Sequence, residues 1–187
     1  MTNTRKMAFV AILSTLSFLL MFVQMPLIPS ASFLQVDLSI LPILLGLVLL
    51  DIRSSLSILL LRSLLKLLLN NQGVGTYIGL PMNMVMIAVF VLAFGLFWKK
   101  SPGTKNFILA GLVGTLVSTL VMLVLNYIYA MPLYAAFANF DIGKIIGVVP
   151  YLFSMVLPFN LIQGVIYTVA FALTFSALTP VLKSYEI

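Results

Sequence analysis

The chain has 187 residues, of which 63% are hydrophobic, and it carries only ten basic and four acidic side chains. Charged residues make up 7% of the chain, whereas they are roughly a quarter of a soluble globular protein, so the composition indicates an integral membrane protein. The chain contains neither histidine nor cysteine, which excludes disulfides, the usual zinc ligands and a thiol or imidazole nucleophile. We therefore expect neither an enzyme nor a metal site.

Six apolar segments, separated by proline, glycine and charged residues, predict a compact all-α bundle of six membrane-spanning helices in a single domain, 1–187. The first segment ends at Pro26 and Pro29, because a proline biases the preceding residue away from helical geometry. Asp51 to Arg53 separate the second and third segments, which predicts a tight helical hairpin. The predicted helices cover approximately 6–24, 38–50, 54–70, 78–98, 106–131 and 151–182.

Two segments, 25–37 and 132–150, are too polar and too broken to span a membrane, and we expect them to form structured outer loops. Within the first, the alternation from Phe33 to Asp37 predicts a short extended piece over a cavity. We expect Pro132 to end the fifth helix, and Pro158 either to kink the last helix or to mark its start.

Lys and Arg are distributed unequally between the two ends of the predicted bundle. The excess on the side that carries both termini predicts that both termini are cytoplasmic. This asymmetry accounts for the net charge of +6 without nucleic acid as a partner. Lys144 falls on the opposite side, against seven basic residues on the side of the termini: Arg5, Lys6, Arg53, Lys99, Lys100, Lys105 and Lys183.

Arg62 and Lys66 lie inside the third apolar segment, four residues apart and therefore on one helical face. Each charge at that depth costs about 2.5–3.5 kcal/mol on insertion scales and usually faces a protein interior or an aqueous cavity. The pair therefore belongs either to a binding pocket or partner contact, or to side chains that extend to the membrane interface.

Four amide side chains fall at the outer ends of the predicted helices: Asn83, Asn126, Asn160 and Gln163. A buried amide needs partners for two donors and an acceptor, and any one of them could be satisfied by a neighbouring helix. Four on the same membrane face instead predict an outward-facing pocket for an uncharged, flat ligand with a hydrogen-bonding edge. Tyr127 lies at the same level, where a membrane-interface belt and a stacking role are both open.

Several short motifs occur in a characteristic order. They are Leu34-x-x-Asp37-x-Ser39-x-x-Pro42, Gly75-x-x-x-Gly79-x-x-x-Asn83, Asn126 followed by Pro132-x-Tyr134, and the run from Pro158 to Gly164, Pro-Phe-Asn-Leu-Ile-Gln-Gly. With this order, nearly the whole chain resembles the substrate-binding (S) components of energy-coupling factor (ECF) vitamin transporters, and most closely the riboflavin-specific ones. Gly75-x-x-x-Gly79 is equally compatible with close helix packing.

The resemblance implies a bacterial plasma-membrane, multi-pass protein in which the first outer loop caps a high-affinity vitamin site. Riboflavin would be the transported ligand, with no resident cofactor. The partners implied are a membrane coupling subunit and two cytoplasmic ATPases. The first helix would dock to the coupling subunit through Ala8, Ala11 and Thr15, where Ala11-x-x-x-Thr15 approximates the usual alanine pair.

By position, the resemblance also implies which residues bind the vitamin. Gln163 stands where a lysine is expected, and Asp51-Ile52-Arg53 replaces the usual Gly-Pro turn. The alternatives are an S component for another vitamin, such as thiamine or pantothenate, and a membrane scaffold whose Arg62 and Lys66 face a partner. The implied substrate-binding residues are Leu34, Gln35, Asp37, Gly79, Asn83, Asn126, Tyr127, Asn160 and Gln163.

Overall fold

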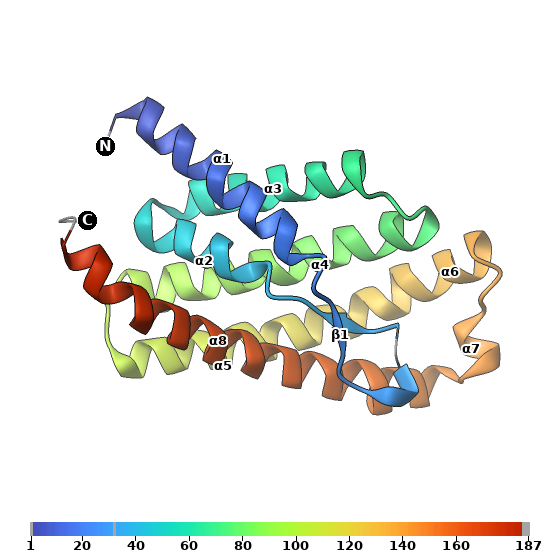
Figure 1. Cartoon of the computed structure of the whole chain (residues 1–187). Coiled ribbons are helices and arrows are strands. Elements are labelled where there is room, and N and C mark those ends of the chain that lie inside the picture. Colours follow the sequence, from blue (N-terminus) through green and yellow to red (C-terminus); the bar gives the residue numbers. More distant parts are fainter. Residues whose placement is uncertain (1, 32, 185–187) are drawn as a thin grey trace.

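The computed structural model describes residues 2–31 and 33–184, and most of them are helical (Figure 1). A two-stranded antiparallel ribbon pairs Met25 with Val36 and Pro26 with Gln35. The α-helices are α1 (Asn3–Leu20), α2 (Ile40–Leu49), α3 (Ile52–Leu69), α4 (Val74–Ala93), α5 (Thr104–Leu125), α6 (Met131–Phe137), α7 (Ile142–Ile145) and α8 (Leu157–Ser184), and the strands are β1 (Met25–Pro26) and β2 (Gln35–Val36).

In the part of the chain that the structure describes, three π-helical turns lengthen these helices. Phe94–Lys99 continues α4, Asn126–Ala130 joins α5 to α6, and Pro150–Val156 leads into α8. The expected end of the fifth helix at Pro132 is therefore wrong, because the helical stretch continues to Phe137. Pro132 is tolerated because it lies in the first turn of α6, where the missing N–H costs little.

Of two other helix starts, one differs from the sequence-based expectation and one agrees with it. The fourth helix begins at Val74, four residues before the predicted start at 78, so that Pro81 lies inside α4. The last helical stretch begins with the π turn at Pro150, and Pro158 is the second residue of α8. Pro158 therefore follows the start of this stretch instead of marking it.

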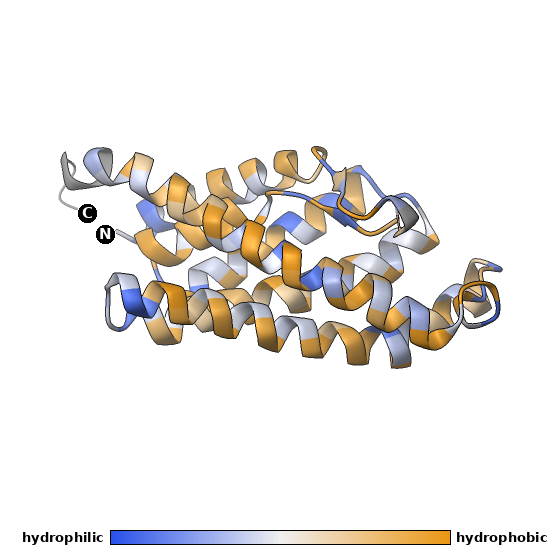
Figure 2. Ribbon diagram, turned by 90° about the horizontal axis from the view of Figure 1, so that it is seen from below, coloured by the Kyte–Doolittle hydropathy of each residue, from blue (hydrophilic) through white to orange (hydrophobic). Residues whose placement is uncertain are grey.

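Among the described residues, three helical stretches are long and apolar enough to cross a membrane: Val74–Lys99, Thr104–Phe137 and Pro150–Pro180. The apolar helix α2 has only ten residues. Helices α1 and α3 have 18 residues each and carry basic side chains. Figure 2 shows that hydrophobic residues dominate the bodies of the helices, while hydrophilic ones gather in the connections.

The ends of α1 and α8 that carry the termini lie at one end of the bundle, together with the α2–α3 and α4–α5 turns (Figure 1). The β-ribbon, the α3–α4 turn and α6–α7 lie toward the opposite end. At the end with the termini, the aromatic side chains of Phe94, Trp98, Phe107, Phe171 and Phe175 pack with ring centroids 5.0–6.2 Å apart. Polar cavities lie at the other end, beneath the ribbon.

Candidate functional site

Two adjoining cavities lie beneath the loop at 25–37, which we call the covering loop. The first has a volume of about 180 Å³ and the second about 310 Å³. Both are lined by Phe33, Gln35, Gly79, Asn83 and Tyr134, so they form two halves of one compartment. Ligand pockets usually measure roughly 300–1,000 Å³, so the compartment has the volume of a small-molecule site.

Most of the residues implied by sequence come together here. Seven line the first cavity: Leu34, Gln35, Gly79, Asn83, Asn126, Asn160 and Gln163. Asp37 lines the second cavity. Tyr127 lines neither and is 57% exposed, because the residue after the inward-facing Asn126 is rotated to the outer surface of the helix. The structure therefore gives no support to Tyr127 as a binding residue.

Aromatic contacts hold the covering loop over the first cavity. The ring of Phe33 stacks on Tyr151 with centroids 6.3 Å apart, and it meets Phe140 edge-on at 6.5 Å. At the end of the loop, the carboxylate of Asp37 accepts a hydrogen bond of 2.8 Å from the backbone N–H of Ser39. This bond fixes the loop at the start of α2. The covering loop is therefore held both at Phe33, over the cavity, and at Asp37, where α2 begins.

Asn126 is 5% exposed, and its amide links α5 to the π turn that precedes α8. Its Nδ2 donates to the Met122 carbonyl at 2.8 Å, and its Oδ1 accepts from the Tyr151 hydroxyl at 2.5 Å. Since a backbone carbonyl can only accept, the orientation of this amide is fixed. Asn126 and Tyr151 together form a rigid polar edge of the cavity.

Asn160 and Gln163 are buried on neighbouring positions of α8. Asn160 Nδ2 donates to the Val156 carbonyl at 2.8 Å, and Gln163 Nε2 donates to the Tyr167 hydroxyl at 2.9 Å. Within the described ranges, neither Asn160 Oδ1 nor Gln163 Oε1 accepts a hydrogen bond. Both amides line the cavity, so their oxygens can accept from a ligand there.

The two basic residues of α3 behave differently. Arg62 is fully buried and donates through Nη1 to Ser39 Oγ at 2.7 Å and through Nη2 to Asn83 Oδ1 at 2.8 Å. Lys66 reaches toward the end of its own helix, where Nζ donates to Asn70 Oδ1 at 2.6 Å. Lys66 is 9% exposed and lines the second cavity, whereas Arg62 lines neither cavity and belongs to the protein interior.

Sulfur-containing and aromatic side chains form the apolar walls of the first cavity, and sequence analysis missed most of them. Gly79, Met82, Asn83 and Met86 share one face of α4 at helical spacing, so the position of Asn83 could have identified the two methionines. The additional lining residues are Phe33, Met82, Met86, Met122, Tyr134, Tyr151 and Phe159. Methionine adapts to irregular shapes and packs well against aromatic rings, which suits a broad, flat ligand.

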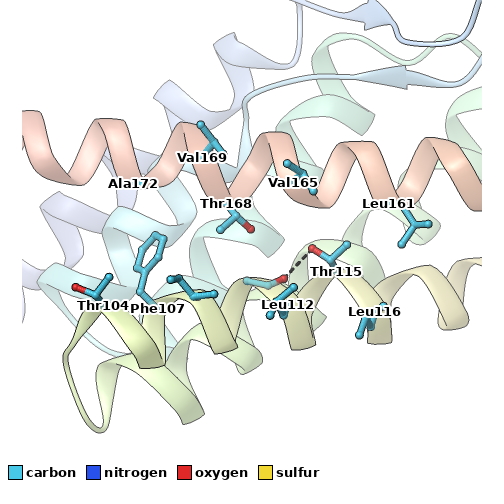
Figure 3. A pocket seen from close by; sticks show the side chains of 12 residues that line it. Thr104, Phe107, Leu112, Thr115, Leu116, Leu161, Val165, Thr168, Val169 and Ala172 are labelled. Carbon is cyan, nitrogen blue, oxygen red and sulfur yellow. Dashed lines mark hydrogen bonds between the residues drawn. The ribbon is translucent and has the colours of Figure 1, made fainter.

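A third hollow, of about 540 Å³, is a groove between α5 and α8 (Figure 3). Apart from threonines, its lining is apolar. The hydroxyls of Thr115 and Thr168 donate to the carbonyls of Gly111 and Gly164 on their own helices, at 2.7 and 2.8 Å. This groove, which we call the α5–α8 groove, therefore offers a ligand few free polar atoms and is not the candidate site.

The site contains no metal-binding arrangement of side chains. Over residues 2–31 and 33–184, no three acidic residues gather where they could hold a metal ion. The compartment combines neutral amides, methionines and aromatic rings, with Asp37 and Lys66 confined to its second half. Such an arrangement can bind and orient a ligand, and it provides no nucleophile with an adjacent base.

Comparisons with known proteins agree with this geometry. A family model for the substrate-specific component of ECF transporters matches residues 5–175. The chain is 59% identical over 182 residues to the riboflavin transporter RibU of Streptococcus thermophilus, covering 97% of this chain and 86% of that protein. It is 42% identical over 189 residues to the riboflavin transporter RibU of Leuconostoc mesenteroides, covering 99% and 96%.

A solved structure of the S component of a bacterial ECF transporter has the same fold. It superposes with a TM-score of 0.78 at 27% sequence identity, covering 97% of this chain and 99% of that chain. The similarity thus extends over nearly the whole chain. The chain belongs to the family of substrate-specific components of ECF transporters.

Proposed function

We propose that this protein binds riboflavin in the compartment beneath the covering loop and carries it across the bacterial plasma membrane as the S component of an ATP-driven transporter. The observation that carries the proposal is the convergence of Asn83, Asn126, Asn160 and Gln163 on one cavity with apolar and aromatic walls. Relatives at 59% and 42% identity that are riboflavin transporters support the choice of vitamin.

The chemistry of riboflavin matches the two halves of the compartment. Its uncharged tricyclic ring has wide faces for Phe33, Met82 and Phe159, and burying them provides the favourable free energy of binding. Its pyrimidine edge carries donors and acceptors that the amides can pair, which penalises ligands that leave the amides unpaired. The ribityl hydroxyls would extend toward the more polar second half, where Gln35, Asp37 and Thr76 lie.

In the membrane, we propose six spanning helices with both termini in the cytoplasm. The end of the bundle that carries the termini has six basic residues on helices α1 and α3 and around the α4–α5 turn: Arg5, Lys6, Arg53, Lys99, Lys100 and Lys105. This excess supports a cytoplasmic location for that end. The covering loop would then face the outside, where the vitamin enters.

ATP hydrolysis would be supplied by two cytoplasmic ATPases that act through a membrane coupling subunit. We propose that α1 docks to that subunit through Ala8, Ala11 and Thr15, which are all exposed along one side of the helix. Small residues allow a partner helix to approach closely in a bilayer. The same face also carries the exposed side chains of Ile12 and Leu19.

The proposed ligand is tested directly on purified protein in detergent. We expect co-purifying flavin in the absorbance spectrum, and saturable one-to-one quenching of flavin fluorescence at nanomolar concentrations when the stripped protein is titrated. Titrations with thiamine and pantothenate serve as controls for the other vitamins. Folded protein that does not quench flavin fluorescence would overturn the assignment of riboflavin while leaving the family and the fold intact.

The docking face is tested by Ala11→Leu, which adds bulk to the exposed side of α1. We expect unchanged riboflavin affinity, because Ala11 lines neither cavity, and loss of riboflavin uptake by cells. Ile12→Ala is a matched control, since it reduces the bulk of the same face and should leave uptake intact. Normal uptake by the Ala11→Leu variant would exclude this face as the docking surface.

A further inference from the structure

Arg62 is a fully buried cation in a helix bundle, and it contacts the site without lining it. We propose that Arg62 is a positioning residue that fixes the orientation of the Asn83 amide, so that the site presents a hydrogen-bond donor to the ligand at this position. The inference rests on the proposed function, since it assigns part of the ligand recognition in the same compartment.

The geometry joins three segments of the chain. From α3, Arg62 Nη2 donates to Asn83 Oδ1 of α4 at 2.8 Å, and Nη1 donates to Ser39 Oγ, at the start of α2, at 2.7 Å. Ser39 is itself fixed, because its N–H donates to Asp37 and its carbonyl accepts from Ser17 Oγ at 2.6 Å. The guanidinium group is therefore held from both sides and has no freedom to follow a rotating amide.

The chemistry of the two groups determines which atom of Asn83 faces Arg62. A guanidinium group carries only donors, whereas an amide has a donor end and an acceptor end. Only the Asn83 oxygen can pair with Arg62. The opposite orientation would place two donors against each other and leave the buried cation without that acceptor, which is costly. The Asn83 Nδ2 is consequently directed away from Arg62.

Asn83 lines both cavities, so its Nδ2 is a donor at the junction of the two halves. No acceptor for this group occurs among the residues that the structure describes. The free oxygens of Asn160 and Gln163 lie on α8, in the wall of the first cavity. The site therefore requires an acceptor on the ligand near Asn83 and donors on the ligand near α8. A ligand with a ring carbonyl beside a ring N–H has both kinds of group.

Lysine cannot replace arginine in this role. Arg62 makes two hydrogen bonds in fixed directions to different helices, whereas an ammonium group is a compact charge on a flexible stem. Within the described residues, neither of the ion pairs, Lys6–Asp51 and Lys144–Asp141, involves Arg62. Among the described residues, neutral acceptors therefore pair with Nη1 and Nη2 of Arg62, while its Nε has no partner, and the Asn83 oxygen is one of the two acceptors.

The decisive variant is Asn83→Asp, which retains an oxygen for Arg62 but removes the donor. We expect it to keep the melting temperature of the ligand-free protein and to bind riboflavin at least tenfold more weakly. Asn83→Ala should weaken riboflavin binding and also lower the melting temperature by about 3 °C or more, because the guanidinium loses an acceptor. Asn71→Asp adds the same charge to an exposed amide outside both cavities, and it should change neither quantity.

A double-mutant cycle then separates positioning from independent binding. We expect Arg62→Lys to weaken riboflavin binding several-fold, and Arg62→Lys combined with Asn83→Ala to bind as weakly as Asn83→Ala alone. Losses that multiply in the double variant, or unchanged affinity in Asn83→Asp, would overturn the proposal. If Arg62→Lys fails to fold, Asn83→Asp alone decides.

The same experiments distinguish this inference from the proposed function. If the wild-type protein does not bind riboflavin, the proposed function fails, and the melting temperatures still test the contact between Arg62 and Asn83. Equal destabilisation by Asn83→Asp and Asn83→Ala would then show that Asn83 Oδ1 does not serve Arg62, and the inference would fail as well.

Discussion

The α5–α8 groove and the compartment beneath the covering loop differ in what they offer a ligand. The groove has the larger volume, about 540 Å³ against 180 and 310 Å³ for the two cavities. The hydroxyls of Thr115 and Thr168 in the groove are occupied by the backbone of their own helices, whereas amide oxygens remain free in the compartment. Burial of apolar surface is available in both hollows, but only the compartment can discriminate between ligands.

Helices α5 and α8 are tightly packed against each other beside the groove. A Cβ atom added at Gly164 would overlap the side chain of Thr115, and one added at Gly111 would lie 2.5 Å from Thr168 Cγ2. The two helices thus approach each other closely beside the groove. We interpret the groove as part of the packing interface, or seam, between α5 and α8, and the compartment as the ligand-binding site.

The largest effect is expected from Gly164→Val, which inserts a side chain into this seam. The substitution should lower the free energy of unfolding by about 3 kcal/mol, because α5 and α8 must separate to accommodate it. The matched control is Gly75→Val, since no atom lies within 4 Å of a Cβ at Gly75. Thermal unfolding in detergent measures both variants, and equal melting temperatures would contradict the interpretation of the groove.

The second effect concerns binding and not folding. Asn160→Ala should weaken riboflavin binding tenfold or more, on the order of 1–3 kcal/mol, because a buried ligand group loses its partner. Val165→Ala, one turn further along α8 in the wall of the groove, should leave the affinity unchanged. Fluorescence titration of the two variants compares the hollows directly. Unchanged affinity in Asn160→Ala would remove this residue from the site.

The amides of the compartment could be predicted from the sequence because polar side chains are unusual inside apolar segments. A side chain such as Asn83 or Asn160 inside an apolar segment must find partners, so its presence indicates either an interhelical bond or a ligand. The structure shows that one amide can bond to a neighbouring helix and still line the cavity. Asn126 binds Tyr151 and Met122, and it still lines the cavity.

The apolar walls and the helix ends could not be predicted in the same way. A methionine such as Met122 has the same pattern whether it faces the core, the lipid or a ligand, so only the tertiary structure separates these cases. The π turns at Asn126–Ala130 and Pro150–Val156 insert extra residues into helices, shift the side chains beyond them and allow helices to continue past prolines. Tyr127 is exposed and lines neither cavity, and its position in the sequence alone does not give the direction of its side chain.

The smallest effect is expected from a change in pH. It should alter the stability at the end of the bundle that carries the termini and leave ligand binding at the other end unchanged. At the end with the termini, Lys6 Nζ lies 2.6 Å from Asp51 Oδ2. The hydrogen bond from Lys6, together with the Ser54 N–H, lowers the pKa of Asp51 from its ordinary value of 3.8 to about 2. Because the pKa is lower in the folded protein, this stabilisation is complete above pH 4 and is lost as the pH falls toward 2.

The magnitude should be modest, because both side chains are more than 40% exposed and such pairs contribute about 0.2–1 kcal/mol. We expect Lys6→Met to lower the melting temperature slightly at pH 7 and to reduce its decline below pH 4. Riboflavin affinity should stay constant between pH 5 and 8 in both proteins, since the chain has no histidine and neutral amides line the first cavity. Affinity that varies in this range would show that a charged residue of the second cavity, Asp37 or Lys66, contributes to binding.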